Sequence, residues 1–401
     1  MPPDATAIRD AAVTETTETG APMRRSWLAA AVIAIGSLAA RAQDEHPLGR
    51  ALELLAEVTP FVEKACGAKF ESPPRVVALS EPSAAAVFAE DMRPEYDRRY
   101  AQLPPAQREN LLKLGALTSV RSCLARYSFN THNVIVVRTG FDAQCASLKV
   151  SGERAAQLLR VALAHECVHA LDDARFSLSS LYRKAADDEA LRAVAMIAEG
   201  RAVHFGRIAA AEAGAPKDLV DLLPGGDAPK NERDWLIHLT YRLGARFVGA
   251  LAARGGVALA DRAIASPPAT TWSVCVPSRW PDGKPDERPA KTLAKSGFGE
   301  AAHVLSDLQL RARYAAMKDL GAAEKLFENL TGGAQALVAG TNSAVLSFSD
   351  EESAKRFEEV SRAETRTERR GTVVVRAIGE DQEIAVHELA AALGEGEKVA
   401  K

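Results

Sequence analysis

Residues 159–176 read LRVALAHECVHALDDARF, and this stretch decides how the rest of the chain is interpreted. It contains His165 and His169, four residues apart, with Glu166 directly after the first histidine. Residues four apart lie on the same face of an α-helix, so both imidazoles can reach one metal ion. No proline or glycine interrupts residues 153–173, and apolar residues recur at spacings of three and four, which predicts a helix.

A carboxylate on the next predicted helix, residues 187–211, supplies a third candidate ligand. Glu199 lies thirty residues beyond His169, which leaves room for a turn and an antiparallel return helix. The neighbouring Gly200 indicates either a close approach of two backbones or a local break that aims the carboxylate. Two histidines and a carboxylate leave one position open for water, the arrangement of a catalytic zinc site. The alternative is that Glu199 is an ordinary surface acid.

Glu166 has a different predicted role from the three ligands. It follows His165 on the same helix and therefore lies beside the metal, where it can take a proton from a bound water. The sequence thus predicts His165, His169 and Glu199 as Zn²⁺ ligands and Glu166 as the general base. The competing interpretation is a solvated helix that carries two unrelated histidines.

Two motifs in this region resemble a known family. HECVHALDD (residues 165–173) and AEGRA (residues 198–202) resemble the gluzincins, zinc metallopeptidases with H-E-x-x-H and a glutamate ligand on the following helix. They are more similar still to a group of exported, largely uncharacterised bacterial proteins with H-E-x-x-H-A-L-Q-D-Q and E-G-x-A. Residues 241–248 and 267–271 also match that group. The resemblance implies a zincin-like domain with peptidase activity, although Val276 stands where the group has a histidine.

Further site residues are expected on the same helices. Tyr241 lies off the apolar stripe of the helix predicted over residues 232–254, and gluzincins often use a tyrosine or histidine near the metal. It is therefore the candidate donor to an oxyanion, with a packing role as the alternative. Asp172 and Asp173 follow His169 by three and four residues, so one of them can accept the ring N–H of that histidine. A solvated helix end is the alternative for both.

Residues 1–42 are predicted to lie outside the fold. Residues 1–22 are rich in threonine and show no apolar periodicity. Met23-Arg24-Arg25 then precedes an apolar run of about fourteen residues that ends at Ala40-Arg41-Ala42, the order of a secretory signal. We expect cleavage near Ala42 and export to the periplasm or the medium. An uncleaved membrane anchor is the alternative, but the run is shorter than the ~20 residues of a typical span.

The five cysteines all lie in the part expected to be exported. Outside the cytoplasm Cys66, Cys123, Cys145 and Cys275 can form two disulfides, and Cys123 with Cys145 is the favoured pair because it ties the segment before the metal helix. The other pairings remain open. Cys167 lies two positions from each histidine, about 200° round the helix, so we expect it to face the core.

Composition and pattern together predict a helix-rich α+β fold. The 401 residues carry a net charge of −3, with 47% apolar and 26% charged residues, so no basic excess indicates a nucleic-acid partner. We expect a zincin-like domain with a two-helix metal site over residues 43–280 and a linker or exposed loop over 281–298. A small α+β domain should follow over 299–401, with strands at 343–348 and 372–377.

The strand predicted over residues 133–138 lies directly upstream of the metal helix. It is either the sheet edge on which a substrate peptide lies extended or a buried strand without a ligand.

The sequence as a whole predicts an exported zinc-dependent hydrolase, in the first place a peptidase that acts on a peptide or protein. No stable membrane span is expected after cleavage of the signal. A zinc-binding, catalytically inactive scaffold of the cell envelope is the alternative, and a zinc hydrolase of other amide or ester bonds is a third hypothesis. The sequence leaves the oligomeric state open.

Overall fold

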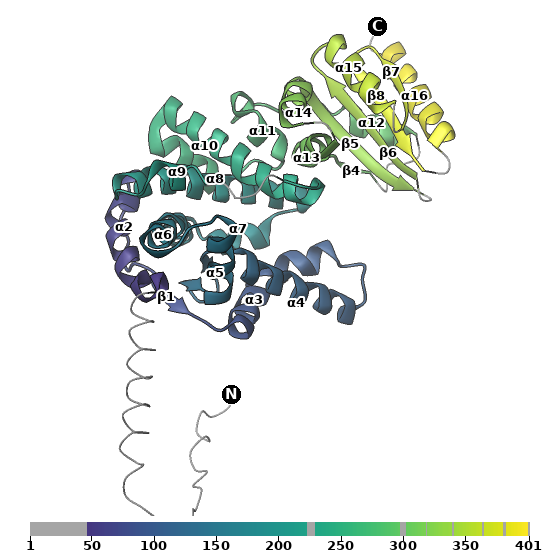
Figure 1. Cartoon of the computed structure of the whole chain (residues 1–401). Coiled ribbons are helices and arrows are strands. Elements are labelled where there is room, and N and C mark those ends of the chain that lie inside the picture. The colour runs from purple at the N-terminus through teal and green to yellow at the C-terminus, as the bar shows by residue number, and fades with distance from the viewer. Residues whose placement is uncertain are drawn as a thin grey trace, which may run out of the picture.

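The computed structural model describes residues 46–222, 229–296, 302–317, 319–338, 341–362, 365–379 and 382–399. The predicted signal segment and its cleavage site near Ala42 lie outside the described residues. The part that is described is a helix-rich α+β structure, as the sequence predicts. Helices dominate the first half, and a five-stranded sheet forms near the C-terminus (Figure 1).

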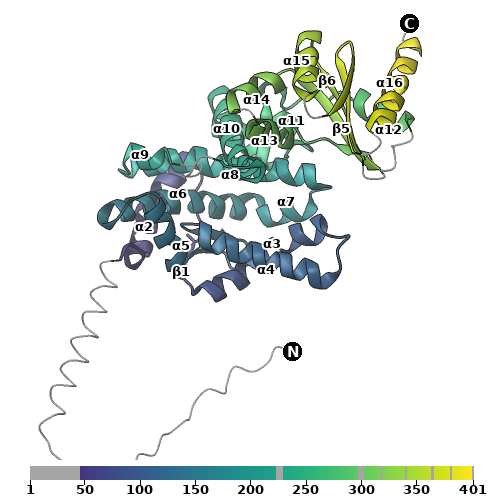
Figure 2. The same ribbon diagram turned by 45° about the vertical axis from the view of Figure 1, so that its right-hand side comes forward.

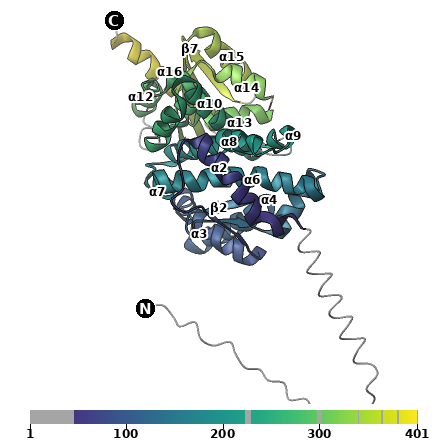
Figure 3. The same ribbon diagram turned by 90° about the vertical axis from the view of Figure 1, so that its left-hand side faces the viewer.

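The metal-motif helix α6 lies at the centre of the helical part. Nearly every residue of α6 from Leu158 to Asp173 is buried, whereas its first turn is exposed. A helix that is buried all round must have neighbours on several sides. Helix α8 packs between α6 and α10, and α2 lies across both α6 and α8 (Figure 3). The bounds of these four are α2 Ala51–Cys66, α6 Gly152–Phe176, α8 Asp188–Glu212 and α10 Glu232–Ala265.

Shorter elements complete this part of the molecule. Asp187 and Asn231 begin α8 and α10 by accepting main-chain N–H groups with their side chains, which explains where both helices start. The shorter helices are η1 Pro47–Arg50, α3 Glu81–Arg99, α4 Pro105–Ser122, α5 Arg138–Ser147, α7 Leu178–Lys184, α9 Lys217–Val220, α11 Thr271–Cys275 and η2 Pro277–Arg279.

A three-stranded sheet flanks α6, in the order β1-β3-β2. Its strands are β1 Arg75–Ala78, β2 Arg126–Ser128 and β3 Asn133–Val136; β3 runs parallel to β1 and antiparallel to β2. The strand predicted at 133–138 is therefore the central strand, with both edges paired and its side chains largely buried. Of the two alternatives, the structure shows the buried strand and not the free edge for a peptide, because β1 and the three-residue β2, which the sequence pattern did not reveal, pair with it on both sides. The strand β2 is the edge nearest α6.

The C-terminal sheet is antiparallel, in the order β4-β5-β6-β8-β7. Alternate residues of its strands point to opposite faces, and each face has its own apolar core. Val345, Val373 and Val375 pack with α12 and α16 on one face, and Leu346 and Val374 pack with α13, α14 and α15 on the other (Figure 2). The bounds are α12 Arg288–Lys295, β4 Ala302–Val304, α13 Asp307–Met317, α14 Leu320–Phe327, β5 Leu330–Val338, β6 Thr341–Phe348, α15 Glu351–Ser361, β7 Arg366–Arg370, β8 Val373–Ile378 and α16 Gln382–Val399.

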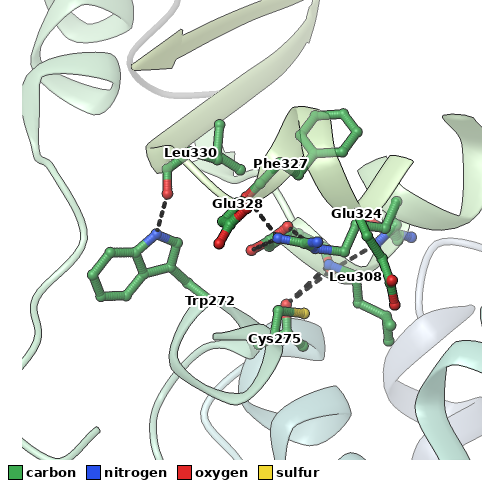
Figure 4. A network of polar contacts seen from close by, with 12 residues as sticks. Trp272, Cys275, Leu308, Glu324, Phe327, Glu328 and Leu330 are labelled. Carbon is green, nitrogen blue, oxygen red and sulfur yellow. Dashed lines mark hydrogen bonds and ion pairs between the residues drawn. The ribbon is translucent and has the colours of Figure 1, made fainter. Parts of the chain in front are cut away.

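Residues 281–298, predicted as a linker or exposed loop, contain helix α12. Leu293 of α12 is fully buried against β5 and β6, so residues 288–295 pack on the sheet. Residues 281–285 are exposed, as predicted for a loop, and residues 297–298 lie outside the described residues. The many proline and charged residues of the segment predicted a loop, although a short helix with one apolar face forms there. Half-buried polar contacts join the sheet to the helical part. The Trp272 indole N–H donates to the carbonyl of Leu330 at 2.9 Å (Figure 4). Arg279 donates to the same carbonyl at 2.6 Å.

All five cysteines are free thiols, so the expected Cys123–Cys145 disulfide is not formed. Cys145 lies in the main helical core, whereas Cys123 packs beside a separate cluster around α3 and α4 and directs its thiol to the carbonyl of Val120. The two side chains therefore belong to different cores. Cys167 is fully buried in the main core and contacts Thr59, as its position on the helix predicted.

Among the described helices, α10 alone has the length and mean hydropathy of a membrane span. Its buried residues Leu239, Leu243 and Phe247 pack in the main core, in contact with α8 and α13. Gly255 and Gly256 interrupt its helical backbone geometry.

Candidate metal centre

The side chains of His165, His169 and Glu199 converge on one point between α6 and α8. The Nε2 atoms of the two histidines lie 3.1 Å apart, and Glu199 Oε2 lies 3.2 Å from each of them. These three residues are the only group of histidine, cysteine and acidic side chains within the described ranges that is arranged to hold a metal ion. The structure therefore brings together the three candidate ligands that the sequence predicted, two from one helix and one from the next.

The separations between these three atoms fit a zinc ion. Ligands bound at about 2.0–2.1 Å in tetrahedral geometry lie about 3.3 Å from one another, close to the observed 3.1–3.2 Å. The nitrogen and oxygen donors are those that zinc accepts, and three protein ligands leave a fourth position free. Both histidine side chains are 8% exposed and that of Glu199 is 22% exposed, so solvent reaches the centre chiefly at Glu199.

The charges of this cluster are strongly coupled when no metal is bound. Burial lowers the pKa of His169, but the carboxylate of Glu199 more than offsets this effect and raises the pKa to about 9. Burial in turn raises the pKa of Glu199, yet the charges and hydrogen bonds of His169 and His165 hold it well below its ordinary value. Glu199 therefore stays ionised, and its negative charge attracts cations, as a cation-binding site requires.

Glycines let the three helices of the centre approach closely. A Cβ atom on Gly200 would lie 2.2 Å from the main chain of Gly244, so α8 and α10 touch through their backbones beside Glu199. A Cβ atom on Gly206 would lie 3.1 Å from the Cα atom of His165, so α8 and α6 are also close. Gly200 thus marks a close approach, one of the two alternatives predicted, and no helix break occurs there.

The contact at Gly244 places Tyr241, one turn earlier on α10, over the candidate ligands. Its ring stacks on that of His165 with centroids 6.1 Å apart and an angle of 29° between the planes. The carboxylate of Glu199 raises the pKa of Tyr241 well above its ordinary value, and burial and Glu166 raise it further. The hydroxyl therefore keeps its proton and remains a hydrogen-bond donor near the ligands.

Glu166 is buried beside the cluster and does not belong to the ligand triangle. Its Oε2 atom accepts the main-chain N–H of Tyr127 at 2.7 Å, so the edge strand β2 fixes one oxygen of this carboxylate. The second oxygen has no hydrogen bond of its own among the described residues. The sequence analysis missed Tyr127, because a three-residue strand with a single outward N–H leaves no periodic signal.

The two aspartates after the motif do not support His169 as predicted. Asp172 instead forms a doubly hydrogen-bonded ion pair with Arg201, at 2.7 and 2.8 Å, and both side chains are fully buried. Asp173 accepts the hydroxyl of Tyr127 and the main-chain N–H of Ser179. The Nδ1 atoms of both histidines are buried without a hydrogen-bond partner in the described structure. Both aspartates lie near His169 on the helix, as their spacing predicts. They bind Arg201, Tyr127 and Ser179 of neighbouring elements instead of the histidine.

Arg201, the arginine of the AEGRA motif, has a structural role beside the centre that was not predicted from the sequence. Arg201 also pairs with Asp261 of α10 at 2.9 Å, and its guanidinium lies over the rings of Phe176 and Phe205. It ties α6, α8 and α10 together about half a turn from Glu199. Its position two residues after a candidate ligand, among the small residues Ala198, Gly200 and Ala202, was the available signal.

The stretch at 267–271 has a structural role in the described chain. Thr271 begins α11, and both its N–H and its hydroxyl donate to the buried carboxylate of Glu189 on α8. Val276 follows α11 as an apolar residue, so this region supplies no histidine to the metal centre.

Comparisons with known proteins add little to this geometry. No family model matches the chain, and no curated protein matches it. A solved structure from Chloroflexus aurantiacus, described as a candidate hydrolase with a novel fold, is similar at 14% identity with a TM-score of 0.39. The similarity covers 58% of this chain and 88% of that chain. A likeness this weak carries no argument about activity, so the function proposed below rests on the residues of the site.

Proposed function

We propose that the chain is a zinc-dependent hydrolase that cleaves peptide bonds. The observation that carries this proposal is the triangle of His165, His169 and Glu199, with edges of 3.1–3.2 Å, beside a buried glutamate that is not a ligand. Structural zinc sites use four protein ligands, whereas three ligands with an open position are typical of catalytic sites. The resemblance to gluzincins and export after cleavage near Ala42 are part of the same proposal.

Each residue of the site has a distinct task in this reaction. A zinc ion held by the three ligands would supply a Lewis acid and lower the pKa of a coordinated water towards about 7. Glu166, fixed at one oxygen by Tyr127, would take the proton of the attacking water with its other oxygen and pass it to the leaving amine. The protonated hydroxyl of Tyr241 would donate to the carbonyl oxygen as negative charge develops there.

The proposal is tested by digestion of a mixed peptide library with the full chain. Wild type should contain about one zinc ion and cleave peptides, and Glu166→Gln should retain the zinc but lose about 10²–10⁴-fold in rate, because an amide cannot accept the proton. Glu153→Gln, an exposed glutamate in the first turn of the same helix, is the matched control and should behave as wild type. Zinc content is measured by plasma mass spectrometry on every variant.

Two results would refute the proposal. Full zinc content in both His165→Ala and His169→Ala would mean that the metal is bound elsewhere. Cleavage by Glu166→Gln at the wild-type rate would mean that another group is the base.

A zinc-binding scaffold without activity is the second candidate. An observation compatible with it is an open surface pocket of about 790 Å³ beside β7 and α15, lined by charged residues such as Arg366, Glu368 and Arg369. Under this hypothesis the zinc would stabilise the helical part, and a partner would bind at the sheet. Bound zinc with no cleavage of any library peptide would favour the scaffold.

A further inference from the structure

The edge strand β2 is attached to α6 at two points by a single residue. The main-chain N–H of Tyr127 donates to Glu166 Oε2 at 2.7 Å, and its phenol hydroxyl donates to Asp173 Oδ2 at 3.2 Å. Glu166 and Asp173 are seven residues apart, so they lie two turns apart on the same face of α6. The backbone and the side chain of Tyr127 thus contact the same helix face.

The side chain of Tyr127 is held in one place. The residue is 4% exposed, and its ring packs edge-on against Phe129, with centroids 5.5 Å apart. Burial raises the pKa of this tyrosine, and the carboxylate of Asp173 raises it further, so the hydroxyl keeps its proton. Because a carboxylate only accepts, the single hydroxyl proton points to Asp173.

The hydroxyl oxygen has a second neighbour in His132, at the end of the turn between β2 and β3. His132 Nδ1 lies 3.1 Å from this oxygen and 3.4 Å from Asp173 Oδ2. With the tyrosine proton on Asp173, this contact is a hydrogen bond in the tautomer of His132 that carries its proton on Nδ1. Asp173 also accepts the N–H of Ser179 at 3.2 Å, which fixes the carboxylate from the side of α7.

Of the three residues of β2, Tyr127 alone forms hydrogen bonds to α6 in the described structure, whereas Arg126 donates to Ser119 on α4 at 2.7 Å. The strand has three residues and pairs with β3 on one side only, which leaves its other edge to α6. Strand edges with few partners open readily. Loss of the hydroxyl contact would therefore allow the N–H of Tyr127 to move away from Glu166.

We propose that Asp173 and the Tyr127 hydroxyl are positioning residues that hold the main-chain N–H of Tyr127 on Glu166 and so keep this carboxylate oriented toward the metal centre. The effect on rate rests on the proposed role of Glu166 as the general base. The effect on the strand does not.

The test compares Tyr127→Phe with Tyr314→Phe, a half-buried tyrosine of α13 that packs on Phe327 in the C-terminal part. Amide hydrogen exchange at residue 127 is measured in the full chain by NMR, together with zinc content, kcat and KM. Hydrogen bonds to charged groups correspond to roughly ten- to a hundredfold in an equilibrium constant, so Tyr127→Phe should speed exchange by about that factor. Its kcat should fall about tenfold or more at unchanged zinc content, with KM altered less than about twofold.

A second pair of variants separates positioning from a general loss of stability. In a Glu166→Gln background, Tyr127→Phe should cause no further loss of rate, because the group that it positions is already gone. Asp173→Ala and Tyr127→Phe combined should cost no more than the larger single effect. Exchange and kcat that match those of Tyr314→Phe would overturn the proposal. If wild type cleaves nothing, the proposed function fails. The exchange rate at residue 127 still decides whether the Tyr127 hydroxyl and Asp173 hold the N–H of Tyr127 on Glu166.

Discussion

Zinc binding to the metal-free chain should strengthen with pH up to about pH 9 and release a proton below it. A histidine binds zinc only in its neutral form. In the metal-free centre Glu199 raises the pKa of His169 to about 9, although burial opposes this. Below that pH a proton therefore occupies the Nε2 atom that zinc must reach, and this proton has to leave when zinc binds.

The size of the effect follows from the pKa of His169. At pH 7, about two units below a pKa of about 9, the apparent affinity should be roughly a hundredfold weaker than its limit at high pH. Between pH 7 and 9 it should rise by close to tenfold per pH unit, and at pH 7 each zinc ion should displace about one proton from this site. The same shift stabilises the metal-free fold below pH ~6.5, and that contribution is lost as the pH rises through about 9.

The assay is competition with a chelator of known pH dependence, combined with calorimetry in buffers of different ionisation enthalpy. Glu199→Gln is the informative variant, because it removes both a ligand and the charge that raises the pKa of His169. Its affinity should be lower at pH 9, and its pH dependence between 7 and 9 should be flatter than that of wild type. An affinity of wild type that is constant between pH 7 and 9, or no proton release at pH 7, would refute the reasoning.

Four further predictions concern the packing and chemistry of the centre. Gly244→Ala places a Cβ atom 2.0 Å from the carbonyl oxygen of Met196, so urea unfolding should show a loss of about 1–3 kcal/mol or more. Asp172→Asn weakens the buried pair with Arg201 and should lower the free energy of unfolding by about 3 kcal/mol. Tyr241→Phe should keep zinc and lower kcat by about 10²-fold, as expected for loss of one oxyanion donor. Thiol titration of the denatured chain without reductant should find five free thiols, and reductant should leave the thermal midpoint unchanged.

The parts of the site that the sequence predicted depend on helical geometry. The spacing of His165, His169 and Glu166 fixes their relative directions within one helix, whatever surrounds it. Glu199 required only that the next helix return alongside the first. Both conditions are local or nearly so, and the structure places the three ligand atoms together.

The parts that the sequence did not predict depend on contacts between elements. Asp172 has the helical phase to serve His169, yet its partner was decided by Arg201 on another helix. The role of residues 133–136 as a central strand depends on β2, which has three residues and no distinctive alternation. To predict whether Cys123 and Cys145 pair, one must know that they lie in two different cores. The spacing of cysteines along the chain does not contain this information.

The metal centre owes its geometry to helix packing more than to the ligands themselves. Gly206 brings α8 against the backbone of His165, and Gly200 brings α8 against α10 at Gly244. Both contacts lie within two turns of Glu199, so the position of its carboxylate relative to α6 is set by backbone contacts that tolerate almost no displacement. The Arg201–Asp172 pair joins α8 to α6 about half a turn from Glu199. These backbone contacts and the ion pair hold together the helices that carry the three candidate ligands. Helices held in this way also fix the positions of Glu166 and Tyr241 around those ligands, as a hydrolytic site requires.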